Sequence, residues 1–81
     1  MRDKIIDFLF TIKGKKSDRL IRKLVAEHFG GTITSGRYVK IGDEEWAIKN
    51  NPDCMDTRFC GYEVRLMTWK HGNDWKYTAP Y

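Results

Sequence analysis

The sequence predicts a small α+β domain, with two N-terminal helices packed on one face of a four- to five-stranded antiparallel β-meander. Hydrophobic residues recur with the period of a helix as far as residue 29, and with the period of a strand from residue 31 onward. Short turn motifs separate the later segments, as hairpins require. With 81 residues the chain has room for a single domain, with a helical part at about residues 3–29 and a sheet at about 31–79.

Residues 4–13 fit either a helix or a strand. A helix would gather on one face Ile5, Phe8, Leu9 and Ile12. A strand would gather on one face Ile6, Phe8, Phe10 and Ile12. We favour the helix because Asp3 can cap its start and Gly14 can end it. The strand would instead give the order β-α-β-β-β-β.

Residues 17–31 predict a second helix with clear ends, because Ser17 is a good N-cap and Gly30-Gly31 stop helices. Its apolar stripe consists of Leu20, Ile21, Leu24, Val25 and Phe29. The opposite face carries Arg19, Arg22, Lys23 and Ala26. This face therefore has three cations in one ridge, which the preceding loop extends with Lys13, Lys15 and Lys16.

Two hairpins follow, one about Ser35-Gly36 and one about Gly42-Asp43. In the second hairpin Ile41 should oppose Glu44. The next pairs are then Lys40 with Glu45, and Val39 with Trp46. A charge pair falls on one face and an apolar pair on the other, so the turn position and the side-chain alternation agree on one register.

The last hairpin runs through residues 61–78, and Gly72-Asn73 suits its turn. Trp69 then opposes Lys76, and Thr68 opposes Tyr77. The core face holds Tyr62, Val64, Leu66, Thr68, Trp75 and Tyr77. The other face holds Glu63, Arg65, Met67, Trp69, Lys76 and Thr78. Since Trp, Met and Arg are typical of interfaces, we expect an interaction surface there, made of Arg65, Met67, Trp69 and Lys76.

No residue pattern typical of a catalytic or metal site is present. His28 and His71 are isolated, and five residues separate Cys54 from Cys60, which is not a zinc spacing. Whether the two cysteines pair stays open. The basic residues of the strands should be scattered, unlike those of a metal-free nuclease; they are Arg37, Lys40, Lys49 and Arg65. We therefore expect a non-enzyme without catalytic residues, bound metal, cofactor or small-molecule ligand.

The sequence favours a cytoplasmic protein. Its apolar run IIDFLFTI is interrupted by Asp7 and is too short to cross a membrane. Two cysteines are too few for the disulfide framework of a small secreted domain.

The charge distribution predicts an anionic partner. The chain has 15 basic and 11 acidic residues, and its first 23 residues hold eight basic against three acidic ones. Our leading expectation is a nucleic acid, DNA or RNA, whose phosphates contact Lys13, Lys15, Lys16, Arg19, Arg22 and Lys23. The alternative is a protein-protein interaction module, such as a small virus- or mobile-element-encoded inhibitor or accessory factor of a host protein complex.

Overall fold

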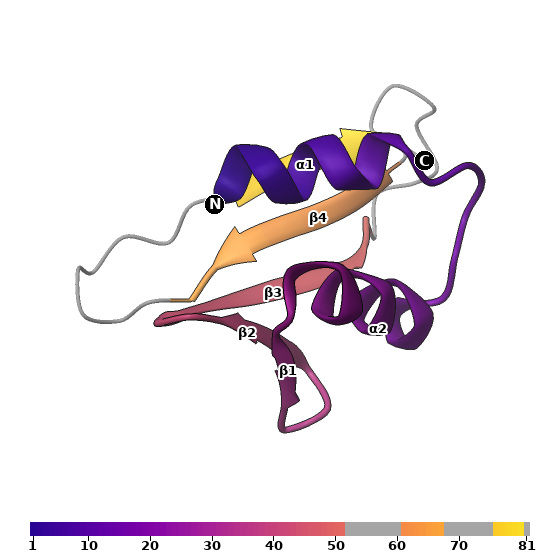
Figure 1. Ribbon diagram of the computed structural model, residues 1–81. Coiled ribbons are helices and arrows are strands. Elements are labelled where there is room, and N and C mark those ends of the chain that lie inside the picture. The colour runs from indigo at the N-terminus through magenta and orange to yellow at the C-terminus, as the bar shows by residue number, and fades with distance from the viewer. Residues whose placement is uncertain (52–60, 68–75, 81) are drawn as a thin grey trace.

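The computed structural model describes residues 1–51, 61–67 and, for the backbone, 76–80 (Figure 1). The remaining residues lie outside this description. The predictions that concern them therefore stay predictions: the pairing of the cysteines, the Gly72-Asn73 turn, and the roles of Trp69 and His71.

Residues 4–13 are mostly helical, since helix α1 spans Arg2–Phe10. The predicted caps are wrong, because the N-cap is Met1 and the C-cap is Thr11, while Asp3 lies in the first turn. The helix ends early because Thr11 closes its last turn. Both the backbone N–H and the hydroxyl of Thr11 donate to the Phe8 carbonyl, at 3.0 and 2.6 Å.

Helix α2 (Asp18–Phe29) has both of its predicted ends. The Ser17 hydroxyl accepts a hydrogen bond from the Leu20 N–H at 3.2 Å, which satisfies one of the free donors of the first turn. Gly30 ends the helix in the left-handed conformation, with φ at 67° and its N–H bonded to the Ala26 carbonyl. Local side-chain and backbone chemistry therefore sets the length of α2.

The buried face of α2 is rotated from the predicted one. Ala26, placed on the basic face by the sequence pattern, is 7% exposed, whereas Leu20, placed in the apolar stripe, is 42% exposed. The fully buried positions are Ile21 and Val25. The rotation turns Arg22 toward the sheet, so the expected ridge of three cations is divided.

An antiparallel sheet follows the two helices, which confirms the α+β class. Its strands are β1 (Thr32–Thr34), β2 (Tyr38–Ile41), β3 (Glu44–Asn50), β4 (Gly61–Leu66) and β5 (Lys76–Pro80). They lie side by side in chain order. The predicted register of the second hairpin is confirmed, because Val39 pairs with Trp46, Lys40 with Glu45 and Ile41 with Glu44.

The predicted pairing of the last hairpin is wrong by four residues. Tyr77 pairs with Val64 and Lys76 with Arg65, not with Thr68 and Trp69. A shift by an even number of residues leaves each residue of β4 on its predicted face, because side chains alternate with a period of two. Tyr62 and Val64 are accordingly fully buried on the core side.

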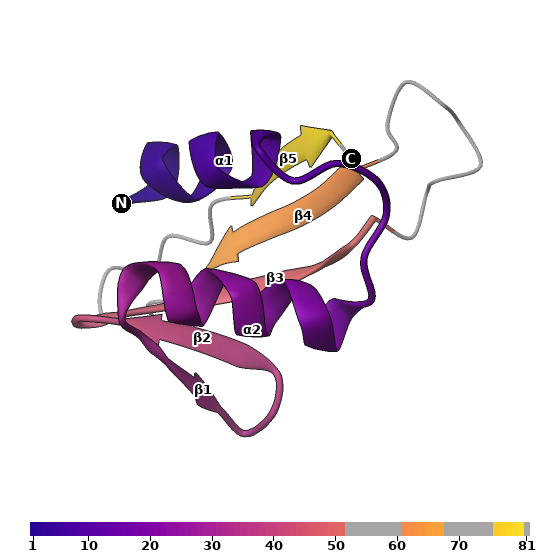
Figure 2. The same ribbon diagram turned by 45° about the vertical axis from the view of Figure 1, so that its right-hand side comes forward.

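Both helices lie on the same side of the sheet (Figures 1 and 2), and the hydrophobic core lies between the helices and the strands. Helix α1 contacts β5, while α2 contacts β1, β2 and β3. The core side chains are Ile5, Leu9, Ile21, Val25, Ala26, Val39, Ile41, Trp46, Ile48, Tyr62 and Val64. No helix among the described residues is long and apolar enough to cross a membrane. No helix of the described residues lies on the other face of the sheet, which we call the outer face.

Candidate functional site

A pocket of about 410 Å³ opens on the outer face of the sheet. We call it the outer-face pocket. Four basic residues line it: Arg22, Arg37, Lys49 and Arg65. Its other lining residues include one acid, Glu63, together with Tyr38, Ala47 and Met67. The strand cations that we expected to be scattered are thus largely brought together, with Lys40 outside the pocket.

The pocket exists because a small residue stands between large ones. Ala47 in β3 pairs with Tyr38 in β2 on one side and with Arg65 in β4 on the other. Directly opposed residues in a sheet point to the same face, so the alanine methyl group lies between a phenol ring and a guanidinium. The register of the three strands therefore creates the hollow and sets a cation beside an aromatic ring.

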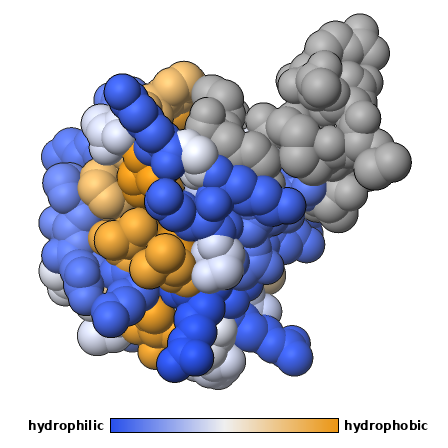
Figure 3. Space-filling model, turned by 90° about the vertical axis from the view of Figure 1, so that its right-hand side faces the viewer, coloured by the Kyte–Doolittle hydropathy of each residue, from blue (hydrophilic) through white to orange (hydrophobic). Residues whose placement is uncertain are grey.

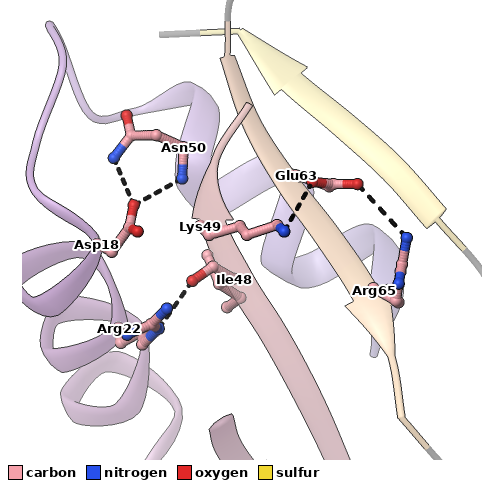
Figure 4. Close-up of polar contacts among 7 residues, drawn as sticks. All are labelled: Asp18, Arg22, Ile48, Lys49, Asn50, Glu63 and Arg65. Atoms are coloured by element: carbon pink, nitrogen blue, oxygen red, sulfur yellow. Dashed lines mark hydrogen bonds and ion pairs between the residues drawn. The ribbon is translucent and has the colours of Figure 1, made fainter. Parts of the chain in front are cut away.

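Arg22 reaches the pocket from α2, at a position where the sheet is incomplete. Strand β2 begins at Tyr38, opposite Ala47, so the next backbone carbonyl of β3, that of Ile48, has no partner in β2. The Nε atom of Arg22 donates to this carbonyl at 2.9 Å (Figure 4). Its Nη1 atom donates to the carbonyl of Gly36 at 3.2 Å. Two of its five N–H groups are used in these bonds, which hold the guanidinium at the edge of the pocket.

Glu63 lies on the outer face as predicted, but it is only 3% exposed. Its carboxylate forms ion pairs with the Nζ atom of Lys49 at 3.8 Å and with Nη2 of Arg65 at 3.7 Å (Figure 4). The side chains of Lys49 and Arg65 remain 50% and 38% exposed. The acid is therefore covered, while both of its cationic partners still face solvent. A buried carboxylate is costly without such partners, so Glu63 fixes the two cations in place.

Asp18 and Asn50 join the start of α2 to the end of β3 beside the pocket. One carboxylate oxygen of Asp18 accepts from the backbone N–H of Asn50 at 2.7 Å and from its side-chain amide at 2.6 Å (Figure 4). Burial raises the pKa of Asp18, but these hydrogen bonds and the charges of Arg22 and Lys49 outweigh it, so the pKa lies below its ordinary value of 3.8. Asp18 stays ionised and holds α2 at a fixed position against the sheet.

The basic loop before α2 is anchored by a buried tyrosine. The hydroxyl of Tyr62 accepts from the Lys16 N–H at 2.8 Å and donates to the Gly14 carbonyl at 3.2 Å. The side chains of Lys13 and Lys15 are exposed, and that of Lys16 is half-buried. The loop therefore presents lysines to solvent from a backbone that is tied to the core.

The six basic residues predicted from the N-terminal region fall in three places, the first of which is the loop with Lys13, Lys15 and Lys16. Arg22 lines the outer-face pocket, whereas Arg19 and Lys23 are exposed on the far side of α2 beside Leu20. On the side of the molecule shown in Figure 3, hydrophobic side chains reach the surface between hydrophilic ones. Arg19 and Lys23 therefore do not line the pocket that Arg22 lines.

Of the predicted interface residues, Arg65 and Met67 both line the pocket. Lys76 pairs with Arg65 in the backbone register, and Trp69 is outside the described residues. Sequence reasoning missed the roles of Arg37 and Lys49. The confirmed register of β2 and β3 could have revealed these roles. Because Tyr38 pairs with Ala47, the residues that follow Ala47 in β3 lie next to the first hairpin turn.

Within residues 1–51 and 61–67, no group of three or more His, Cys, Asp or Glu side chains is arranged to hold a metal ion. His28 instead stacks on Phe8, with ring centroids 4.1 Å apart, and contacts the edge of Phe29. This is a packing role at the boundary between the two helices.

Comparisons with protein-family models, curated proteins and solved structures found no match for this chain. The chemistry of the outer-face pocket is therefore the basis for inferring function. Among the described residues that line the pocket are three guanidinium groups, one ammonium group and one covered carboxylate, so these residues give the pocket a net positive charge. Planar guanidinium groups suit phosphate or carboxylate oxygens.

Proposed function

We propose that the protein is a non-enzymatic basic binding protein that contacts the phosphates of a nucleic acid. The observation that carries the proposal is the outer-face pocket, whose described lining residues include four cations and one carboxylate. The acid is already paired within the fold with Lys49 and Arg65, and the side chains of both are partly exposed, so positive charge is open to a ligand. A planar guanidinium group can donate two parallel hydrogen bonds to two phosphate oxygens. This geometry favours phosphate over a spherical anion such as chloride.

The exposed lysines of the N-terminal loop and the cations on the far side of α2 support the same function. Lys13, Lys15, Arg19 and Lys23 add positive charge that attracts a polyanion from several directions. Binding of this kind releases counterions, so we expect weak sequence preference and a steep loss of affinity with salt.

Fluorescence anisotropy tests the proposal directly, with a labelled single strand and a labelled duplex at about 50 mM and about 200 mM salt. Arg37 is the variant of choice because it lies in an exposed turn and lines the pocket. Arg37→Ala should weaken binding and reduce the slope of log affinity against log salt by about 1. The control is Lys40→Ala, which removes the same charge from the same face outside the pocket. If neither nucleic acid binds at low salt, the proposal is wrong.

A protein partner is the second candidate, in which the chain acts as an interaction module or an accessory factor. The observation that favours it is that Met67 and Arg65 both line the pocket, because both residue types are enriched in interfaces. An acidic peptide would use the same cations as a phosphate. Capture of an acidic protein by the wild type, lost in Arg37→Ala and insensitive to nuclease, would support this candidate over a nucleic acid.

A further inference from the structure

The outer-face pocket has an apolar part as well as a cationic part. Tyr38, Ala47 and Met67 all line it, and their side chains carry a ring, a methyl group and a thioether. Because Ala47 stands between Tyr38 and Arg65 in the strand register, the ring and the guanidinium lie on opposite sides of the hollow. A simple phosphate would use the cations and leave the apolar wall uncovered. The lining therefore suits a ligand with one charged end and one flat apolar end.

We infer that the pocket receives one unpaired nucleotide of a single-stranded nucleic acid. Its phosphate contacts the cations, with Arg37 and Arg65 as the forked donors, and its base lies against Tyr38 and Met67. This inference rests on the proposed function and adds a preference for strandedness to it. The volume of about 410 Å³ lies within the range of pockets that enclose small ligands, so a nucleotide has room.

The expected preference for a single strand follows from the groups that a duplex leaves accessible to such a pocket. In a duplex each base is already stacked on its neighbours and paired, so only its phosphates and groove edges are available. The cations would still bind a duplex, but Tyr38 and Met67 would gain nothing. An unpaired base has a free face, and stacking on an aromatic side chain is tolerant of sequence.

Two variants isolate the apolar part of the pocket without changing its charge. Ala47→Leu fills the hollow from its floor, and Tyr38→Ala removes the ring. Tyr38→Phe is the matched control for the second variant, because it keeps the ring and loses the hydroxyl. Cooperative thermal unfolding of each variant, followed by circular dichroism, shows that it is folded before binding is measured.

The probes are fluorescein-labelled oligo(dT) and oligo(U) of about 12 nucleotides, and a DNA duplex of the same length. The wild type should bind a single strand more tightly than the duplex at equal salt. Ala47→Leu and Tyr38→Ala should each lower single-strand affinity by about five- to a hundredfold, while duplex affinity is unchanged. Tyr38→Phe should bind as the wild type does. The oligo(dT) and oligo(U) arms differ in the sugar and in the 5-methyl group of the base, so equal affinity for both would show that neither feature is needed.

The outcomes separate this inference from the proposed function. If the wild type binds single strand and duplex equally and neither variant changes the single-strand affinity, the nucleotide pocket is wrong and phosphate binding stands. If none of the probes binds, both are wrong. Selective loss of single-strand binding in both variants, with retention in Tyr38→Phe, supports both.

Discussion

Replacing Asp18 by alanine tests how the candidate site is held together. Its carboxylate accepts two hydrogen bonds from Asn50, at 2.7 and 2.6 Å, and these link α2 to β3. Hydrogen bonds to a charged group contribute about 1.5 to 3 kcal/mol each, and partial exposure of this carboxylate places them at the lower end. The alanine variant also leaves the partly buried backbone N–H of Asn50 without this acceptor. We expect the free energy of unfolding to fall by about 2 to 3 kcal/mol.

For a domain of this size, such a loss lowers the melting temperature by about 10 to 20 °C. Thermal and urea denaturation followed by circular dichroism measure it. Asp7→Ala is the matched control, because Asp7 is an exposed acid in α1 and its loss should change stability by less than about 0.5 kcal/mol. Equal stability of the two variants at about pH 7 would refute the assigned role of Asp18.

The pH dependence of the same pair gives a second check. The pKa of Asp18 is lower in the folded protein than its ordinary value of 3.8, so its contribution is complete above that value. The contribution is lost as the pH falls through the lowered pKa, because the neutral acid no longer offers the same acceptor. The stability difference between wild type and Asp18→Ala should therefore shrink below pH 3.8. A difference that stays constant or grows in acid would contradict the lowered pKa.

Three further variants probe how other parts of the fold are tied together. Arg22→Ala should cost about 1 to 3 kcal/mol in urea denaturation because it removes two bonds to backbone carbonyls, whereas exposed Arg19→Ala should be near neutral. Gly31→Ala should destabilise the protein by more than about 1 kcal/mol, because its new Cβ would meet the Lys40 carbonyl, and a wild-type melting temperature would contradict that contact. Tyr62→Phe should cost about 1 to 3 kcal/mol and speed hydrogen exchange in the basic loop, because its hydroxyl holds two backbone groups there.

Sequence reasoning succeeded where neighbouring residues decide the structure. The ends of α2 depend on Ser17 and Gly30, whose bonds join residues three or four positions apart. The register of β2 and β3 depends on a two-residue turn, and Gly42 takes the positive φ of 60° that such a turn requires. The misplaced end of α1 has the same local origin, because Thr11 supplied a closing bond that the pattern of apolar residues does not reveal.

The candidate site was recognised only in part, for reasons that concern packing. Helical periodicity placed Arg22 beside Arg19 and Lys23 on a solvent face, but the contact of α2 with the sheet turned it inward. Alternation placed Glu63 on the outer face, but could not show that its two cationic neighbours would allow it to be buried. The pairing of β4 with β5 differs from the prediction by four residues, and the chain that connects these two strands lies outside the described residues.

The sequence by itself determined the class of the fold, the ends of α2, the pairing of β2 with β3 and the excess of positive charge. Each of these depends on residues close together in the chain or on composition alone. The tertiary structure decided which charges meet, because the bonds that build the outer-face pocket join distant residues. Arg22 and Ile48 are 26 positions apart, and Asp18 and Asn50 are 32 positions apart. Such contacts form only when a helix docks on a particular place of the sheet, and side-chain periodicity carries no information about that place.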